Sequence, residues 1–157
     1  MKITLLTVGK TNFKFIKDGL AVYEKRLVRY IPFIRIEIPE LKNVSSLSPD
    51  QIKKKEAELL LKKIKNGQRI ILLDEKGKTF TSVKWAHFLE KSISNDRRDI
   101  IFIIGGAYGF AKEIYDIASD KLSLSYMTFS HQIVRLIFIE QLYRTFTIIK
   151  GEPYHNE

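Results

Sequence analysis

A run of apolar residues near the C-terminus constrains this chain more than any other feature. In a helix over residues 131–149, the apolar side chains point in every direction, so that no face is left for water. They are Ile133, Val134, Leu136, Ile137, Phe138, Ile139, Leu142, Tyr143, Phe146, Ile148 and Ile149. The pattern predicts a helix that is buried on all sides, either in the core or against another protein chain.

The same run carries His131, Arg135, Glu140 and Arg144, and charged groups are rarely buried without a partner or a function. His131 lies four residues before Arg135, so these two share one face of the helix. Glu140 and Arg144 have the same spacing, for which an intrahelical ion pair is the simplest interpretation. We therefore expect a binding site or a subunit interface along this helix.

The composition is typical of one globular domain over residues 1–157, with 45% hydrophobic and 29% charged residues. The absence of cysteine excludes disulfides, thiolate metal sites and a cysteine nucleophile. No cluster of His, Asp and Glu has metal-ligand spacing, so no metal is expected. We see neither a secretory signal nor an apolar run of membrane-spanning length, and we expect a cytoplasmic protein without a membrane partner.

The net charge of +9 lies entirely in the first half of the chain. Residues 1–78 hold 18 Lys and Arg against 9 Asp and Glu, whereas residues 79–157 hold 9 of each. This asymmetry favours a polyanionic partner, with nucleic acid as the first candidate. For the lysine-rich helix after Pro49 taken alone, a solvated surface is the simpler interpretation.

Strand and helix patterns alternate along almost the whole chain. Strands are predicted at residues 2–8, 33–38, 69–74, 99–104 and 122–125, with helices between them and the apolar helix last. The first helix starts near Phe13, whose ring opens an apolar stripe, and Pro32 stops it. The alternation predicts an α/β fold with a mostly parallel sheet covered by helices.

Local signals define the second helix best. Ser48 is the expected N-cap, Pro49 the first helical residue and Gln51 the partner in a capping box, with Gly67 just past the end. In the next segment, residues 75–78 are expected to form a tight turn and Ser82 to cap a helix that ends before a turn at residues 94–98. In that helix, His87 lies among apolar residues and is interpreted as structural.

Three predicted strand ends release into turns, at residues 73–74, 104 and 124–125. In an open α/β sheet, ligands bind outside the carboxyl ends of the strands, so these turns are expected to line one pocket. The GGAYG turn after Ile104 has neither GxGxxG nor phosphate-loop spacing, and no GxSxG elbow occurs. The polar tail with Tyr154 and His155 is expected to dock on the domain.

Four motifs resemble a known family: LLDEKGK at 72–78, IIGGAYGF at 103–110, LSLSYMTFSHQIVRLIFIEQLYRTFTIIKG at 122–151, and EPYH at 152–155. They look like the small bacterial SPOUT-class methyltransferases that modify N3 of a pseudouridine in 23S ribosomal RNA. The resemblance implies an α/β knot fold, with a trefoil knot in about residues 69–157. It also implies an obligate homodimer, whose interface would contain the apolar helix.

The resemblance further implies S-adenosylmethionine as cofactor and a set of residues that would cradle its adenosine and methionine parts. These are Leu73, Gly105, Leu124, Ser125, Tyr126, Met127, Thr128 and Phe129. For catalysis, Arg135 and Arg144 are candidates for stabilising RNA phosphate or the base anion. His131 and His155 are candidates for hydrogen bonding or proton transfer, and Tyr154 for closing over the target base.

The expected partner is 23S ribosomal RNA or the assembled ribosome, with the basic helix after Pro49 contacting phosphates. Two alternatives stay open. The chain could be a SPOUT enzyme acting on another RNA, such as a transfer RNA, or a ribosome-binding module without catalysis.

Overall fold

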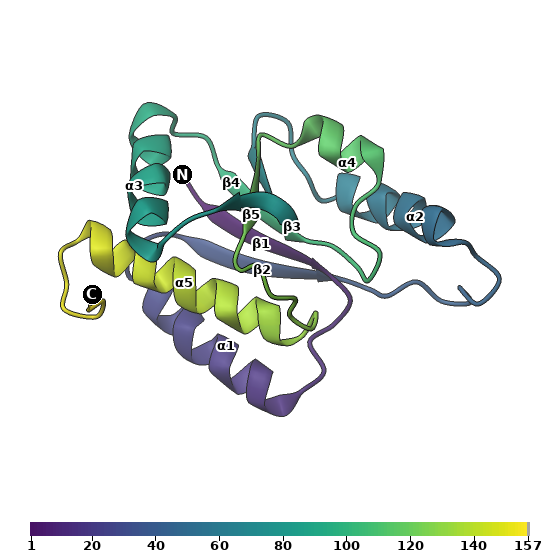
Figure 1. Ribbon diagram of the computed structural model, residues 1–157, viewed down its shortest axis with the longest axis horizontal. Coiled ribbons are helices and arrows are strands. Elements are labelled where there is room, and N and C mark those ends of the chain that lie inside the picture. Colours follow the sequence, from purple (N-terminus) through teal and green to yellow (C-terminus); the bar gives the residue numbers. More distant parts are fainter. Residues whose placement is uncertain (157) are drawn as a thin grey trace.

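The computed structural model describes residues 1–156 and builds them on a five-stranded sheet (Figure 1). Its strands are β1 (Ile3–Val8), β2 (Phe33–Ile38), β3 (Arg69–Thr79), β4 (Ile100–Ile104) and β5 (Asp120–Ser123). They lie in the order β2-β1-β4-β3-β5, and every pairing between these strands is parallel. The predicted α/β fold with a mostly parallel sheet is confirmed.

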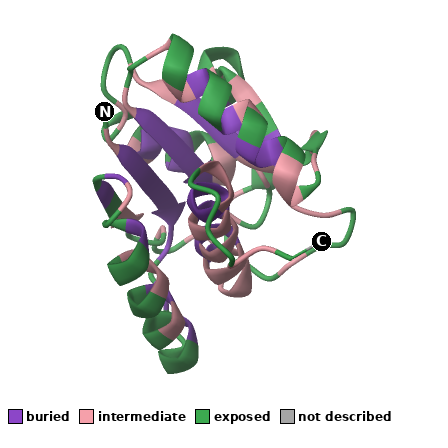
Figure 2. Cartoon of the chain, turned by 90° about the vertical axis from the view of Figure 1, so that its left-hand side faces the viewer, coloured by how far each residue is buried: buried purple, intermediate pink, exposed green. Residues whose placement is uncertain are grey.

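Helices cover both faces of this sheet (Figure 1). They are α1 (Lys14–Leu27), α2 (Pro49–Leu61), α3 (Ser82–Asn95), α4 (Lys112–Ile117) and α5 (Ile133–Ile149). The apolar side chains of α1, α3 and α5 pack on one face, and those of α2 and α4 pack on the other. Because successive strand residues point to opposite faces, β4 sends Phe102 to the first core and Ile103 to the second. Figure 2 accordingly shows the central strands as a buried layer, covered by helices whose outer surfaces are exposed except on α5, where every residue is intermediate or buried.

The capping box of α2 is confirmed. Ser48 accepts a hydrogen bond from the Gln51 amide at 3.2 Å, and the Gln51 side chain accepts one from the Ser48 amide at 2.8 Å. The prediction that Gly67 directly follows this helix is wrong, because α2 already ends at Leu61. Gly67 adopts a φ of +82° in the turn that leads into β3, where a side chain would be strained.

The predicted tight turn at residues 75–78 is also wrong, because β3 continues to Thr79. Both Leu73 and Lys78 pair with Leu122, so the residues between them bulge out of the ladder. A Cβ on Gly77 would lie 2.7 Å from the backbone of Leu122. Only glycine allows the bulge to close this tightly on β5.

Four further differences concern residues in or next to helices. Thr81, not Ser82, caps α3 by accepting a hydrogen bond from the Lys84 amide at 3.2 Å. This helix runs on to Asn95, into the predicted turn at 94–98. His87 is exposed and lies 3.9 Å from Glu90, because the core face of α3 is formed by its neighbours in the helix. Phe13 precedes α1 as its N-cap and is 53% exposed, so it is not part of the buried stripe.

The C-terminal helix begins at Ile133 and the last strand ends at Ser123, so the predicted strand at 122–125 is shifted. Residues 124 and 125 therefore belong to the loop that connects β5 with α5. Every residue of α5 is at least partly buried within the single chain, where the helix packs on α1 and α3. Within residues 1–156, no helix is long and apolar enough to cross a membrane.

Candidate functional site

A cavity of about 380 Å³ lies at the carboxyl ends of β3, β4 and β5. Its walls come from the β3 bulge, the glycine turn after β4 and the loop between β5 and α5. This is the edge at which the sequence places three strand ends. The volume is in the range of sites for small molecules and cofactors.

Seven of the eight residues predicted to hold the cofactor line this cavity. They are Leu73, Gly105, Leu124, Ser125, Met127, Thr128 and Phe129. Tyr126 does not line it: this side chain is 94% exposed, and its hydroxyl lies 3.2 Å from that of Thr79. Along an irregular loop, neighbouring side chains point in different directions. A motif that matches as a whole therefore does not place each of its side chains in the cavity.

The predicted strand end at Asp74 lines the cavity, and Tyr115 of α4 is a lining residue that sequence reasoning missed. Asp74, Glu75 and Lys76 enter the wall because the segment is a bulge rather than a turn that leaves the sheet. Tyr115 of α4 donates a hydrogen bond to the Asp74 carboxylate. Burial and this bond raise the pKa of Tyr115 to about 12, so its hydroxyl stays a neutral donor that ties α4 to the bulge.

The glycine turn is held from the other side by Glu56 of α2. The carboxylate of this buried residue accepts a hydrogen bond from the Gly106 amide, and burial raises the pKa of Glu56. A Cβ on Gly106 would lie 2.5 Å from the Glu56 oxygens, and one on Gly105 would lie 3.0 Å from the Phe110 ring. At Gly105 and Gly106, a larger side chain would force these neighbours to move. Sequence reasoning missed Glu56, because this residue lies within a lysine-rich helix.

A second polar cluster joins the tail to the C-terminal half of α5. Arg144 contacts Glu140 at 2.5 Å and His155 Nδ1 at 3.2 Å, and its guanidinium lies 4.8 Å from the centre of the Tyr154 ring. The Tyr154 hydroxyl donates to Glu140 at 3.0 Å. Burial, with hydrogen bonds to Tyr23 and Glu140, raises the pKa of Tyr154. The predicted ion pair and the docking of the tail are confirmed, while Glu157 lies outside the described residues.

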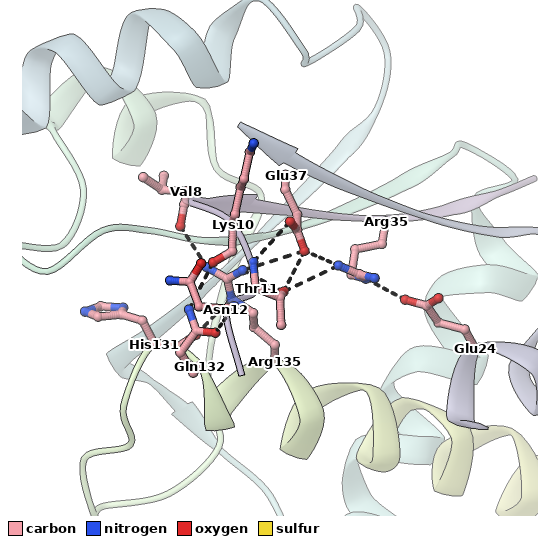
Figure 3. A network of polar contacts seen from close by, with 10 residues as sticks. All are labelled: Val8, Lys10, Thr11, Asn12, Glu24, Arg35, Glu37, His131, Gln132 and Arg135. Carbon is pink, nitrogen blue, oxygen red and sulfur yellow. Dashed lines mark hydrogen bonds and ion pairs between the residues drawn. The ribbon is translucent and has the colours of Figure 1, made fainter. Parts of the chain in front are cut away.

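Arg135 lies apart from this cluster, at the other end of α5. Its side chain is 1% exposed and donates three hydrogen bonds of 2.9 Å, to the His131 carbonyl, the Thr11 hydroxyl and the Val8 carbonyl (Figure 3). Nine residues of helix separate it from Arg144, about 13 Å along the axis. Three of the four predicted catalytic residues therefore come together, and Arg135 is buried elsewhere.

The cavity and the tail cluster are also separate within one chain. Val134 of α5 lines the cavity, and Arg144 follows ten residues later, about 15 Å along the helix. Within residues 1–156, no group of three or more His, Cys, Asp or Glu side chains is arranged to hold a metal ion.

A family model described as "Predicted SPOUT methyltransferase" matches residues 1–155. The chain belongs to the SPOUT methyltransferase family. This confirms the resemblance that its four motifs indicate.

Curated relatives of this SPOUT methyltransferase match it over the full length. A protein of Parabacteroides distasonis named "Ribosomal RNA large subunit methyltransferase H" is 50% identical over 157 residues, which cover 100% of both chains. One of the same name from Cytophaga hutchinsonii is 49% identical over 156 residues, 99% of this chain and 100% of the relative. A solved structure described as "Structural insights into the 2-OH methylation of C/U34 on tRNA" covers 96% of this chain and 99% of its own, with a TM-score of 0.47 at 12% identity. A likeness of that degree carries no argument.

Membership of a SPOUT methyltransferase family implies the use of S-adenosylmethionine. The cavity of this SPOUT methyltransferase suits such a ligand chemically. Leu73 and Ile104 offer apolar surface for a purine, Ser125 and Thr128 offer hydroxyls, and Asp74 offers a carboxylate for a cationic group. Gly105, Gly106 and Gly109 line the cavity without side chains, so a ligand can come close to their backbone.

Proposed function

We propose that this chain transfers a methyl group from S-adenosylmethionine to N3 of a pseudouridine in 23S ribosomal RNA, acting in the cytoplasm on the assembled ribosome. The single observation that carries the proposal is the cavity at the carboxyl ends of β3, β4 and β5, which the family motifs line. The names of full-length relatives that share half of its residues support ribosomal RNA as the substrate class.

In this proposal, Leu73, Gly105 and the loop of residues 124–129 hold the cofactor. Glu56 keeps the glycine turn in place by accepting from the Gly106 amide, so that the turn can approach the ligand closely. When bound, S-adenosylmethionine supplies an electrophilic methyl group on sulfur. The protein then has two tasks, which are to orient the N3 atom towards that methyl group and to handle the imide proton.

The tail cluster is suited to the second task. Arg144 can only donate hydrogen bonds, so His155 Nδ1 accepts from it, and a neutral His155 ring then carries its proton on Nε2. The Arg144 guanidinium is available to stabilise an N3 anion or an adjacent phosphate, because Glu140 and Tyr154 fix its position. Arg135, which is buried, would act by positioning other groups.

The separation of the two sites supports a homodimer. Within one chain, about 15 Å of helix lies between Val134 at the cavity and Arg144. Val134, Ile137 and Ile148 are apolar residues of α5 that stay half-buried in the single chain, and they offer a surface for a second copy. We propose that α5 packs in the dimer interface, so that the tail of one subunit serves the cavity of its partner. We also propose that residues 1–157 are one domain and that about residues 69–157 carry the trefoil knot.

Methyl transfer from labelled S-adenosylmethionine tests the proposal. We would compare intact ribosomes, free large subunits, naked 23S ribosomal RNA and transfer RNA, and identify the product nucleoside by mass. Methylated pseudouridine from the ribosomal samples is the expected result. Label in transfer RNA alone would move the substrate to another RNA, and cofactor binding without any transfer would contradict this reaction.

A further inference from the structure

The segment of residues 9–15, which joins β1 to α1 and includes the first residues of that helix, has no part in the function proposed above. We call it the β1–α1 segment. In the sheet, β1 lies directly beside β4, whose end carries the glycine turn of the cavity. The segment therefore leaves the same edge of the sheet as the three loops that line the cavity.

A single side chain of the loop before α5 clamps this segment. Gln132 accepts a hydrogen bond from the Asn12 amide at 2.7 Å and donates one to the Lys10 carbonyl at 3.1 Å. Its neighbour His131 lines the cavity. Figure 3 shows the clamp and His131 on the same side of the network. The residue that holds the segment, Gln132, is therefore the direct sequence neighbour of a residue in the cavity wall.

A partly buried network of charged side chains holds Thr11 of the segment (Figure 3). Arg135 donates to the Thr11 hydroxyl, and Glu37 accepts from both the amide and the hydroxyl of Thr11, at 3.1 and 2.6 Å. Arg35 bonds to Glu37 and, at 2.5 Å, to Glu24. Two arginines and two glutamates balance one another here. Only Arg135 is fully buried, and the other three side chains are about a fifth to a quarter exposed. Together their bonds hold the backbone of the segment at Thr11.

The surface of this rigid segment is basic and aromatic. Lys10 is exposed, and within residues 1–156 no ion pair compensates its ammonium group. Phe13 and Phe15 are 53% and 64% exposed, and their ring centroids lie 5.6 Å apart. Lysine attracts phosphate, and exposed aromatic rings stack on unpaired bases. A fixed backbone lets these groups bind without the cost of ordering a loop.

We propose that the β1–α1 segment is an RNA-binding surface beside the cavity, with Lys10 contacting a phosphate and Phe13 and Phe15 stacking on bases. Gln132 and Arg135 are positioning residues for it. The inference rests on the proposed function in that it takes RNA as the substrate. It adds the protein surface that binds the RNA next to the target nucleotide.

The test measures binding of labelled 23S ribosomal RNA by filter retention over a series of salt concentrations, and binding of S-adenosylmethionine by calorimetry. Lys10→Ala should lower the slope of log K against log salt by about 0.7 to 0.9, the loss of one phosphate contact, and Lys10→Arg should restore it. Lys91→Ala, which removes an exposed lysine on α3, is the matched control and should leave the slope unchanged.

The double variant Phe13→Leu/Phe15→Leu should weaken RNA binding by about 5- to 100-fold without changing the salt slope. Gln132→Leu should raise the KM for RNA several-fold while the affinity for S-adenosylmethionine and the melting temperature stay close to those of the parent chain. A general loss of folding would also lower the cofactor affinity and the melting temperature, so this pattern identifies an effect on RNA binding alone.

Unchanged RNA affinity in all of these variants, with methyl transfer intact, would overturn the surface and leave the proposed function standing. If the phenylalanine variant instead dissociates a dimer in sedimentation and binds RNA normally, the rings form a contact between copies and the proposal is wrong. A parent chain that neither binds nor methylates RNA would overturn both the surface and the proposed function.

Discussion

Replacing Arg135 by methionine is the sharpest test of how α5 is used. Methionine has a similar reach without charge or hydrogen bonds, so Arg135→Met leaves the Val8 carbonyl and the Thr11 hydroxyl without their donor. It also removes a cation 3.8 Å from Glu37. Losing one partner of a buried charged network costs about 3–5 kcal/mol. For a chain of this size, the melting temperature should then fall by about 6–20 °C.

The measurement is urea unfolding followed by circular dichroism, with Arg144→Met as the matched control. Arg144 lies on the same helix, but its ion pair with Glu140 is partly exposed, so its loss should cost about 1 kcal/mol or less. In methyl transfer the order should reverse for the folded proteins, with Arg144→Met losing about 10²- to 10³-fold in turnover.

An Arg135→Met chain that unfolds within about 1 kcal/mol of the parent would refute the reasoning. Such a result would mean that water or a shifted side chain satisfies the Val8 carbonyl, and that the network does not hold the β1–α1 segment. A large loss of turnover with unchanged stability would return Arg135 to a direct role in catalysis.

Four other changes probe the remaining contacts. Glu56→Gln keeps an acceptor for the Gly106 amide and should bind S-adenosylmethionine nearly as the parent does, whereas Glu56→Leu should bind it about tenfold more weakly in calorimetry. Equal affinities of the two variants would show that the bond from Gly106 to Glu56 does not support cofactor binding. Burial alone would raise the pKa of Glu37, but hydrogen bonds from Thr11 and the nearby arginines outweigh it and lower this pKa below 4.5. Glu37 therefore stabilises the fold above that pH and loses its effect as the pH falls through the lowered pKa, so Glu37→Gln should flatten the acid side of a stability profile, and an unchanged profile would exclude this linkage. Charge reversal of the lysines at 53–55 should weaken RNA association and reduce its salt dependence, and a slope equal to that of the parent would leave α2 as a solvated surface. Loss of the imidazole in His155→Ala should slow turnover without unfolding the chain, while full turnover would remove this residue from the mechanism.

The alternation of strands and helices along the chain, the parallel sheet and the capping box of α2 followed from the sequence. Each depends on local patterns, such as apolar runs of strand length and the Ser48-Pro49-Gln51 spacing. The position of the cavity also followed, because parallel strands bring their carboxyl ends to one edge. The motifs named most of the residues that line it.

The partners of polar side chains that lie far apart in the sequence were decided by the tertiary structure, whereas the Glu140–Arg144 ion pair followed from its four-residue spacing. Arg135 bonds to Thr11, which lies 124 residues earlier in the chain. Glu56 of α2 likewise accepts a hydrogen bond from Gly106, which lies far away in the sequence. The β3 bulge exists because Gly77 can pack against the backbone of β5, which local turn signals cannot reveal. Periodicity tells which face of a helix is buried, but the hydrogen-bond partner of a buried charge depends on which distant segment packs against it. For that reason the sequence determined the fold and the edge that carries the site, and only packing decided which charges act and which hold the structure together.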